Sequence, residues 1–538
     1  MPDLPDGADN LARAVALREV CKTRWGGRFV PAPATTSGHE RLRCHSSEVC
    51  DLCAWLVQDV GYIFATLVAE ERMEDGVTLT YVFQQDSSGS WLDVDVLLDP
   101  HERSVPSISP LVHAADWHER EVEDLFGLHF EGHPRLGEFV LHEDWPEGVN
   151  PMRRDFDPAR ALEHRDEQAA WAAPTIVTAP GAFAMPVGPV FSDFAESAQF
   201  LLETVGEDVI HTIPRFFYKY RGIEKIAEGQ STGRVLLIAE RFSGTAAFAH
   251  GLGFCQAVEA ILHCEVPRRA RALRTLFAEL ERLRHHAAAI TAICGSTALA
   301  VANSQAALIE EELLRLSGTV TGHRYLFGLV VPGGLARDLA DEHRPLLQAA
   351  IGDATGKLNA LYDMLCVSSS FLDRLEEVGV VTAEKATEYG LVGPVARASG
   401  SNRDMRARFP YAGYDTAKPM IPTEHEGDGY ARLRVLFREA EQSAALIHAV
   451  LEALPDGAIA TEPDRTRAGA ALGTVEAPLG AAFHWVRLGE SGLVERYRVT
   501  PPSFTNWHGF HLAAENFAFQ DFPIILASFG LSNAECDR

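Results

Sequence analysis

The N-terminal part of the chain alternates between helical and extended patterns of apolar residues. Residues 47–70 carry apolar side chains at helical spacing, and residues 77–83 and 91–98 have the runs and alternation typical of strands. Residues 114–126 again favour a helix. This order of elements predicts a small α/β domain, which we place at residues 1–156.

Residues 157–185 are rich in charge, alanine and proline and have weak periodicity, so we expect a linker there. Short strands fit residues 187–228. The predicted fold class is α+β, because residues 186–538 then form a mainly helical domain with small sheets at its edges. The helical patterns lie at residues 248–264, 266–291, 300–319, 341–376 and 431–454.

The last of these predicted helices has one apolar stripe. Such a stripe is more typical of a core face than of a partner-binding face. We therefore expect the helix to be buried along that face. The members of the stripe are Leu433, Leu436, Phe437, Ala440, Ala444, Ile447 and Leu451.

Charge limits the partners that the surface can bind. The 538 residues include 75 acidic and 48 basic side chains, a formal net charge of −27. Such a surface repels phosphate backbones and anionic lipid head groups, so we expect no nucleic-acid partner and no direct binding to a membrane surface. The N-terminus lacks a basic start followed by an apolar run, which predicts no secretory signal and a cytoplasmic protein.

We expect no transmembrane helix in this chain. Residues 287–309 form the longest stretch without charge, but alanine dominates it and polar residues interrupt it, so we predict a buried helix there. Nine cysteines are too few for a disulfide scaffold, which predicts reduced thiols. Cys44, His45, Cys50 and Cys53 lack a second cysteine pair at zinc spacing, so we expect no metal there.

A segment of the first domain resembles the signature of a known family. Residues 117–136 have the sequence WHEREVEDLFGLHFEGHPRL, which is similar to E-R-E-x-x-D-L-F-G-x-x-F-x-G-H-P. That pattern belongs to the C-type (30 kDa) subunit of complex I. The match is too long for an arbitrary charged helix that ends at a glycine.

The second domain resembles the D-type (49 kDa) subunit of the same family, with its motifs in the family's order. These motifs are Val187-Gly-Pro, Tyr220-Arg-Gly-Ile-Glu, Phe248-Ala-His, Arg397-Ala-Ser-Gly, Tyr411-Ala-Gly-Tyr, and the more hydrogenase-like Glu476-Ala-Pro and Thr505-Asn-Trp. Fused C and D units occur in large subunits of formate-hydrogenlyase-type complexes. The resemblance covers residues 45–538 and implies a C-type fold followed by a D-type or nickel-iron hydrogenase large-subunit fold.

The hydrogenases of this family hold nickel and iron with two pairs of cysteine thiolates, which are soft ligands. Their first pair lies in E-R-x-C-G-x-C-G-F-A-H, where this chain has Ser243 and Ala246. Their second pair lies in D-P-C-x-x-C-x-x-R, where this chain has Ser532 and Glu535. Cys536 is one position away, and one thiol cannot replace four. We therefore expect no metal on this chain and no hydrogenase activity.

Two further differences agree with this expectation. The arginine of the family's E-A-P-R-G motif is Leu479 here. The hydrogenases also carry a C-terminal peptide that is removed after nickel insertion, whereas this sequence stops at Arg538. The resemblance thus implies that no such maturation step is needed.

The quinone-reducing branch uses a histidine in the loop after G-P and a tyrosine near the first cysteine pair to donate protons and hydrogen bonds. This loop has no histidine here, and Gly244 stands at the tyrosine position. Phe191, Ser243 and Gly244 are the positions expected to line a quinone-like cavity. Asp193, Glu196 and Ser243 offer polar groups, although loops are commonly polar because they are solvated.

The residues expected on the electron-transfer side match the family better than those on the substrate side. The family arginine and histidine beside the cluster of the adjacent small subunit match Arg241 and His286, where a cation or N–H donor raises the cluster's potential. The alternative is that Arg241 pairs with a carboxylate and His286 is a core histidine. Glu224 matches a family carboxylate with a proposed proton-transfer role and is our candidate catalytic residue, although a buried glutamate can simply be paired.

The resemblance implies that this chain binds no cofactor of its own. An iron-sulfur cluster is expected in a small, complex I B-type subunit, and a quinone is a candidate acceptor. Membrane-arm subunits of the same complex would hold the chain at the inner face of the cell membrane. A hard or borderline ion bound by Glu224, His250, Ser532 and Glu535 is a further alternative.

Three functions stay open. An active subunit would have a polar, accessible acceptor cavity beside the partner's cluster. A structural subunit that only docks its neighbours would fill that cavity with Phe191, Phe242, Leu479 and Phe529, although apolar walls also suit a quinone tail. An independent binding protein would need a recognition surface that the sequence does not reveal.

Overall fold

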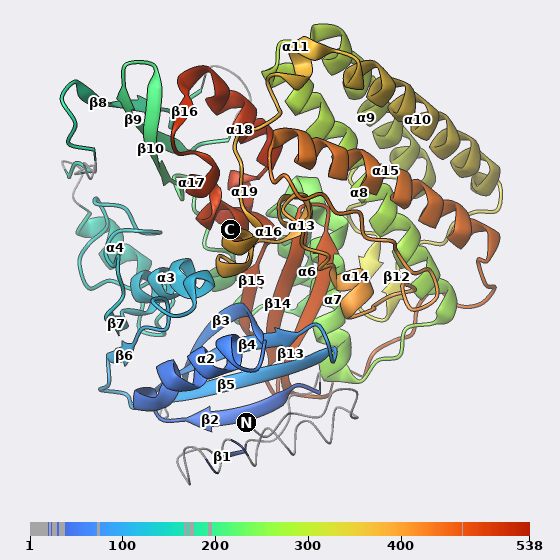
Figure 1. The fold of residues 1–538 in the computed structure, drawn as a ribbon. Coiled ribbons are helices and arrows are strands. Elements are labelled where there is room, and N and C mark those ends of the chain that lie inside the picture. Colours follow the sequence, from blue (N-terminus) through green and yellow to red (C-terminus); the bar gives the residue numbers. More distant parts are fainter. Residues whose placement is uncertain are drawn as a thin grey trace. The chain divides into compact units, whose positions relative to one another are not determined.

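The structure is a computed structural model that describes residues 38–72, 76–165, 169–171, 177–191, 196–464 and 466–538, together with Val20, Thr23 and Val30–Pro31. Figure 1 shows the fold. Both of its compact units combine helices with small sheets, which confirms the α+β fold class. Unit 1 contains Met1–Ala173, Glu388–Gly390 and Gly469–Ala471, and unit 2 contains Pro174–Thr387, Leu391–Ala468 and Leu472–Arg538.

Unit 1 is built on a five-stranded sheet with the order β1-β2-β5-β4-β3. Strands β2 and β5 are parallel, and the other neighbours are antiparallel. Helices α2 (Val49–Gln58) and α3 (Asp116–Phe126) pack on β3. The strands are β1 (Val30–Pro31), β2 (Glu40–Cys44), β3 (Ile63–Arg72), β4 (Gly76–Gln85) and β5 (Ser90–Leu98), with the separate parallel pair β6 (Ser104–Pro106) and β7 (His129–Glu131).

The single helix predicted for residues 47–70 is wrong in its second half. Helix α2 ends at Gln58, and the chain turns at Gly61, whose φ of 78° suits glycine. From Ile63 the chain is strand β3, which pairs with β4. An apolar run such as IFATLVA fits a helix or a strand equally well, and the pairing with β4 decides between them.

Four long helices that lie side by side form the core of unit 2 (Figure 1). They are α8 (Arg268–Ser296), α9 (Ala300–Thr321), α10 (His343–Cys366) and α15 (Gly429–Glu452). All seven residues of the apolar stripe predicted in α15 are buried, which confirms that this stripe is a core face. The predicted helix at 341–376 is interrupted after Cys366, and its last part is the short helix α11 (Ser369–Leu372).

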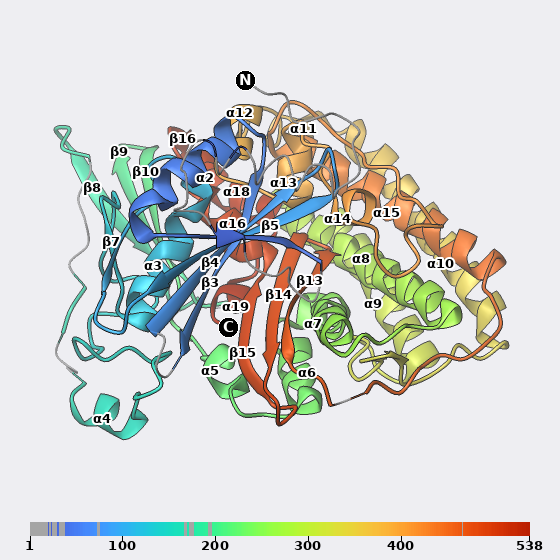
Figure 2. The ribbon, with the colours of Figure 1, turned by 90° about the horizontal axis from the view of Figure 1, so that it is seen from below.

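Two sheets flank these helices. One has the order β16-β10-β9-β8, and the other is the antiparallel sheet β13-β14-β15, which packs against α7 (Figure 2). Their strands are β8 (Ala182–Val187), β9 (Gln199–Val205), β10 (Asp208–Arg215), β13 (Gly469–Ala477), β14 (Gly480–Leu488), β15 (Val494–Thr500) and β16 (Phe517–Ala518). A two-stranded pair joins β11 (Val330–Val331) to β12 (Gly334–Leu335).

Shorter helices connect these layers. In the stretch 157–185, which we expected to be a linker, the structure has helix α4 (Pro158–Glu163) and the first residues of β8. The others are α5 (Ile223–Ala227), α6 (Thr232–Arg241), α7 (Ala247–Leu262), α12 (Ala383–Glu388), α13 (Gly393–Ala398), α14 (Met405–Arg408), α16 (Pro502–His508), α17 (Phe510–Ala513), α18 (Phe522–Phe529) and α19 (Asn533–Cys536).

The uncharged stretch 287–309 is not one helix. Helix α8 ends at Ser296, Ala298 has a positive φ of 62°, and α9 begins at Ala300. Among the described residues, Gly244–Leu262 is long and apolar enough by composition to cross a membrane, and 83% of that window is buried inside the protein. Burial of this kind is typical of a core helix.

Candidate functional site

The two stretches that match the family's thiolate pairs meet in unit 2. Ser243 precedes a short 3-10 turn, Gly244–Ala246, between α6 and α7, and Glu535 lies in α19. The Oγ atom of Ser243 donates a hydrogen bond to Oε1 of Glu535 over 3.1 Å, and both side chains are buried. The place where the family has thiolates therefore holds a hydroxyl bonded to a carboxylate.

Glu535 is held by three groups from distant parts of the chain. Besides Ser243, the backbone N–H of Ser503 in α16 donates to Oε2 over 3.0 Å, and Nε2 of His250 in α7 lies 3.4 Å from Oε1. Burial works against the charged form, but the bonds from His250 and Ser503 outweigh it and lower the pKa of Glu535. The carboxylate is therefore ionised at neutral pH.

A chain of rings continues inward from Glu535. Nδ1 of His250 lies 3.2 Å from Nε2 of His484 in β14, and Nδ1 of His484 lies 2.9 Å from the hydroxyl of Tyr497 in β15. Burial, and then the neighbouring His250, lower the pKa of His484 far below its usual value. Burial, and then Glu224, raise the pKa of Tyr497 well above its usual value. Both side chains are therefore neutral at pH 7.

The loop after the G-P motif also reaches α19. Carboxylate oxygens of Glu196 accept from Oγ of Ser532 over 3.1 Å and from the backbone N–H of Ala534 over 2.9 Å. Glu196 therefore caps α19 rather than standing free as a polar group. Asp193, which we also considered, lies outside the described residues.

The apolar residues expected to fill a cavity have separate surroundings. Phe242 is buried against the ring of His250, with centroids 4.5 Å apart, and Phe529 packs on Phe510. Leu479 is also buried, whereas Phe191 is half-buried. Gly244 is exposed and Ala246 is buried, so the turn between them opens outward at Gly244.

Glu224 lies inside a cluster of guanidinium groups. Its carboxylate is 2.8 Å from Nη2 of Arg496, 3.2 Å from Nη1 of Arg498 and 3.5 Å from Nε of Arg538. Burial alone would raise its pKa, but the three cations outweigh burial and lower the pKa to about 2. The structure thus makes Glu224 a fixed anion, which does not suit a residue that carries protons near neutral pH.

Arg241 lies at the surface of α6, with 46% of its side chain exposed. Its Nη1 pairs with Oε2 of the buried Glu240 over 3.3 Å, as the alternative expected. The guanidinium also stacks over the ring of Phe327, 5.0 Å from the centroid, and Phe327 stacks on His323. The neighbouring Glu240 accepts from the backbone N–H of Gly328 over 3.0 Å and so ties this loop to α6. Arg241 and the rings of the loop 323–328 therefore form one aromatic surface, in which Arg241 pairs with Glu240 and Arg324 with Glu311.

His286 belongs to a different, buried network. Its Nε2 lies 2.9 Å from Oε2 of Glu439, and Oε1 of Glu439 accepts from Arg397. Arg397 also pairs with Glu476 over 2.8 Å and with Asp404 over 3.2 Å. The motif Arg397-Ala-Ser-Gly thus supplies a buried cation that pairs with three carboxylates, Glu439, Glu476 and Asp404. The role expected for His286 beside a cluster stays a prediction.

Residues of the C-type signature make structural contacts inside unit 1. Asp124 accepts hydrogen bonds from the backbone N–H groups of residues 139–141, over 2.7 to 3.1 Å. Gly127 ends α3 with a φ of 70°, and a Cβ there would lie 2.4 Å from Oδ1 of Asn150. These contacts explain why the helix of this signature ends in D-L-F-G.

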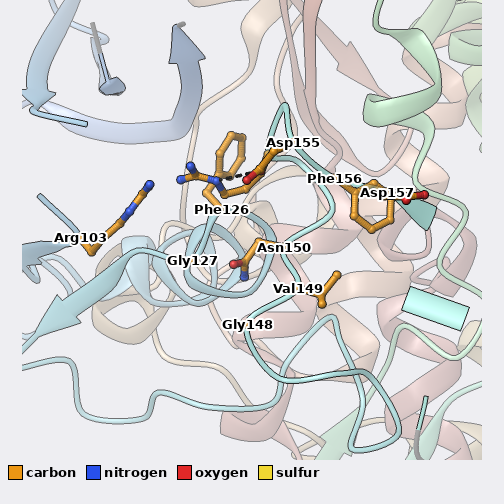
Figure 3. Close-up of a pocket in the computed structure, with 10 residues that line it drawn as sticks. Arg103, Phe126, Gly127, Gly148, Val149, Asn150, Asp155, Phe156 and Asp157 are labelled. Atoms are coloured by element: carbon orange, nitrogen blue, oxygen red, sulfur yellow. Dashed lines mark ion pairs between the residues drawn. The ribbon is translucent and has the colours of Figure 1, made fainter. Parts of the chain in front are cut away.

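A pocket of about 320 Å³ lies beside that glycine (Figure 3). Arg153 pairs with Asp155 at its edge, over 3.5 Å, and with Glu71 over 2.8 Å. The Arg153 cation of this pocket is therefore already paired. Its lining is Arg103, Phe126, Gly127, Gly148, Val149, Asn150, Arg153, Asp155, Phe156 and Asp157.

The residues at the thiolate positions do not fit a nickel-iron centre. Ser532 and Glu535 are engaged with Glu196 and Ser243, and burial raises the pKa of Cys536 well above its usual value. In the part of the chain that the structure describes, no group of three or more His, Cys, Asp or Glu side chains could hold a metal ion. This finding covers both the Cys44 to Cys53 cluster and the group around Glu535.

Comparison with known proteins agrees with the two-part fold. Residues 42–161 match the family of the respiratory-chain NADH dehydrogenase 30 Kd subunit, and residues 305–468 match the family of the 49 Kd subunit of the same enzyme. The chain therefore carries a 30 Kd-type domain and a 49 Kd-type domain fused in one polypeptide, which confirms the predicted resemblance.

Its relatives include hydrogenase subunits and NADH-quinone oxidoreductase subunits. Formate hydrogenlyase subunit 5 of Escherichia coli (strain K12) is 29% identical over 89% of this chain and 85% of its own length. Hydrogenase-4 component G of the same organism is 28% identical over 98% and 93%. The C/D subunit of the NADH-quinone oxidoreductase of Acinetobacter baumannii (strain AYE) is 26% identical over 98% and 97%. The chain is thus related to subunits of multi-subunit complexes.

Sequence reasoning missed the partners that complete this site. His484 and Tyr497 lie on strands whose side chains alternate, and nothing in their spacing distinguishes them from core residues. His323 follows the end of α9 in Thr321-Gly-His-Arg-Tyr, and this polar turn was the available signal. Long-range packing brings all of them to the motif residues.

Proposed function

We propose that this chain is the large, fused subunit of a complex I-like, hydrogenase-4-type membrane oxidoreductase that has no hydrogenase activity. In this proposal the subunit forms an acceptor site beside an iron-sulfur cluster of a small partner subunit. The observation that supports the absence of hydrogenase activity is the hydrogen bond between Ser243 and Glu535. A hydroxyl and a carboxylate bonded to each other cannot act as two thiolate ligands of nickel and iron.

The acceptor site lies at the turn that begins with Ser243. Gly244 is exposed, Thr245 is partly exposed, and the hydroxyl of Thr245 is 3.1 Å from that of Ser243. The partly exposed hydroxyl of Thr245 offers a hydrogen bond to a quinone-like head group. Such an acceptor would take up electrons and protons when bound.

The partner with the cluster docks on Arg241 and the loop 323–328. This surface combines arginine side chains with aromatic rings, and both kinds of side chain are enriched in interface cores. Tyr325 is 36% exposed and continues the aromatic surface. Membrane-arm subunits of the same complex hold the chain as a peripheral subunit at the inner face of the cell membrane.

A structural subunit that performs no chemistry is the second candidate. Phe242 and Leu479 are buried, and Phe242 covers one face of His250, so part of the former metal site is filled by apolar side chains. In this case the chain would only hold the cluster-bearing subunit against the membrane subunits. An acceptor analogue would then have no effect on the cluster.

The first test is metal analysis with electron paramagnetic resonance on the complex purified through this chain, followed by titration with a quinone analogue. We expect iron without nickel and a cluster signal that the analogue perturbs. Stoichiometric nickel would contradict the proposal, and an unresponsive cluster would favour the structural subunit.

A matched pair of variants sharpens this test. Gly244→Phe places a ring at the exposed turn, where a Cβ meets no heavy atom within 4 Å, and should abolish the analogue's effect. Gly233→Phe adds the same ring on α6, where a Cβ also meets nothing within 4 Å, and should leave the effect unchanged. Equal responses of the two variants would place the acceptor elsewhere.

A further inference from the structure

We propose that Glu535, with the ring chain of His250, His484 and Tyr497 behind it, is a buried anion that takes up one proton transiently. The site exchanges this proton with the surface through the hydroxyls of Ser243 and Thr245. The identity of the acceptor does not matter to this site, because only side chains of this chain form it.

Hydrogen bonds connect the site without a gap. From the surface inward, the distances are 3.1 Å from Thr245 to Ser243 and 3.1 Å from Ser243 to Glu535. They continue with 3.4 Å from Glu535 to His250, 3.2 Å between the two imidazoles and 2.9 Å to the hydroxyl of Tyr497. Thr245 is partly exposed and the other five side chains are buried, so the path opens to the surface at one end.

When Glu535 is ionised, the hydrogen-bond donors along the path all point toward it. An ionised carboxylate only accepts, so Ser243 donates to it from one side and Nε2–H of His250 from the other. Nδ1 of His250 then accepts from Nε2–H of His484, whose Nδ1 accepts from Tyr497. Every polar side-chain atom of the path is satisfied in this arrangement, which is what low-dielectric surroundings require.

The protonated state can be satisfied as well. A neutral imidazole can exchange its tautomer and a hydroxyl can rotate, so the path can reverse its direction and accept from a protonated Glu535. Glu224 has no such freedom, because three guanidinium groups hold it as an anion.

Uptake of the proton is a balanced transfer along existing bonds. The Ser243 hydroxyl passes its proton to Oε1 of Glu535 and takes one from the Thr245 hydroxyl, which takes one from a solvent hydronium ion. One proton leaves solvent and one O–H bond forms on Glu535. Release follows the same steps in reverse.

The packing of α7 against β14 leaves room for the side chains of this path. A Cβ at Gly253 would lie 2.5 Å from Cδ2 and 3.0 Å from Nε2 of His484, so only glycine leaves room for this ring. The ring of Phe254 packs edge-on against Tyr497, with centroids 5.5 Å apart, and fixes the inner end. Helix α7 thus supplies His250 and the space for His484.

The test is the rate at which the imidazole N–H of His250 exchanges with solvent in the full chain, measured by nuclear magnetic resonance with ¹⁵N-labelled histidine. Ser243→Ala cuts the path between Glu535 and the surface and should slow this exchange about 100-fold. The matched control is Ser443→Ala, which also removes a buried hydroxyl that donates to a buried carboxylate, Glu279, over 2.7 Å. The control should exchange like the wild type.

A second variant covers the case in which Ser243→Ala does not fold. Thr245→Val keeps the shape of a partly exposed side chain, removes only its hydroxyl and should slow the same exchange. If the exchange rate equals the wild-type rate in every variant of this path that folds, the proton does not travel through Ser243 and Thr245 and the proposal is wrong. Slower exchange in the Ser443→Ala control as well would also overturn it, because the effect would then be general loosening.

Discussion

Glu119 keeps a proton inside the charged helix α3. It is fully buried, its carboxyl group accepts from the Ser107 hydroxyl and from the backbone N–H of Ile108, and His133 lies 3.9 Å away. Burial outweighs these hydrogen bonds and raises its pKa from 4.5 to about 8. At neutral pH this residue is therefore a neutral acid rather than an anion.

This pKa predicts that the first unit loses stability as the pH rises. Between pH 4.5 and about 8 the folded state keeps a proton that the unfolded state releases, so the free energy of unfolding falls across this interval, by a few kcal/mol at most. Glu119→Gln mimics the neutral acid and should remove this slope. Calorimetry should show a melting temperature that exceeds the wild-type value increasingly from pH 5 to pH 8.

The control for this prediction is Glu123→Gln on the same helix, whose carboxylate is partly exposed. It should leave the pH dependence unchanged. A wild-type slope that persists in Glu119→Gln would show that Glu119 is already ionised in the folded protein.

At the scale of elements, the contact between α7 and β14 positions the candidate site. Gly253→Ala adds a methyl group 2.5 Å from His484, which should cost about 1–3 kcal/mol and displace the imidazole. Gly233→Ala on α6 meets no heavy atom within 4 Å and should be neutral or up to about 1 kcal/mol stabilising. Denaturant unfolding and the ¹⁵N shifts of His484 measure the two effects.

Equal stabilities of these two alanine variants would contradict the close packing of α7 on β14. A stable Gly253→Ala variant with unchanged His484 shifts would have the same meaning. A shift of His484 together with a loss of stability is the expected result.

At the scale of the whole molecule, Arg241 connects this chain to its proposed partner. Removing a cation beside an iron-sulfur cluster disfavours the reduced, more negative form, so Arg241→Ala should lower the cluster's midpoint potential. Each 1.4 kcal/mol of lost stabilisation corresponds to about 60 mV for one electron. Redox titration of the purified complex measures the shift.

Arg234→Ala is the matched control, because it removes an exposed arginine from the other end of helix α6. This variant should leave the potential unchanged. If Arg241→Ala also leaves it unchanged, the cluster does not lie beside Arg241 and the docking surface proposed around it is wrong.

The sequence by itself determined the fold class, the long helices and the loss of the thiolates. Residue identities are sufficient for these conclusions, because helical periodicity is local and a serine or glutamate cannot become a thiolate. Only the tertiary structure decided that Ser243 contacts Glu535, that Glu224 is held by three arginines and that residues 63–72 are a strand. These outcomes depend on groups far apart in the chain, and burial among such groups sets hydrogen bonds and pKa values that no local pattern contains.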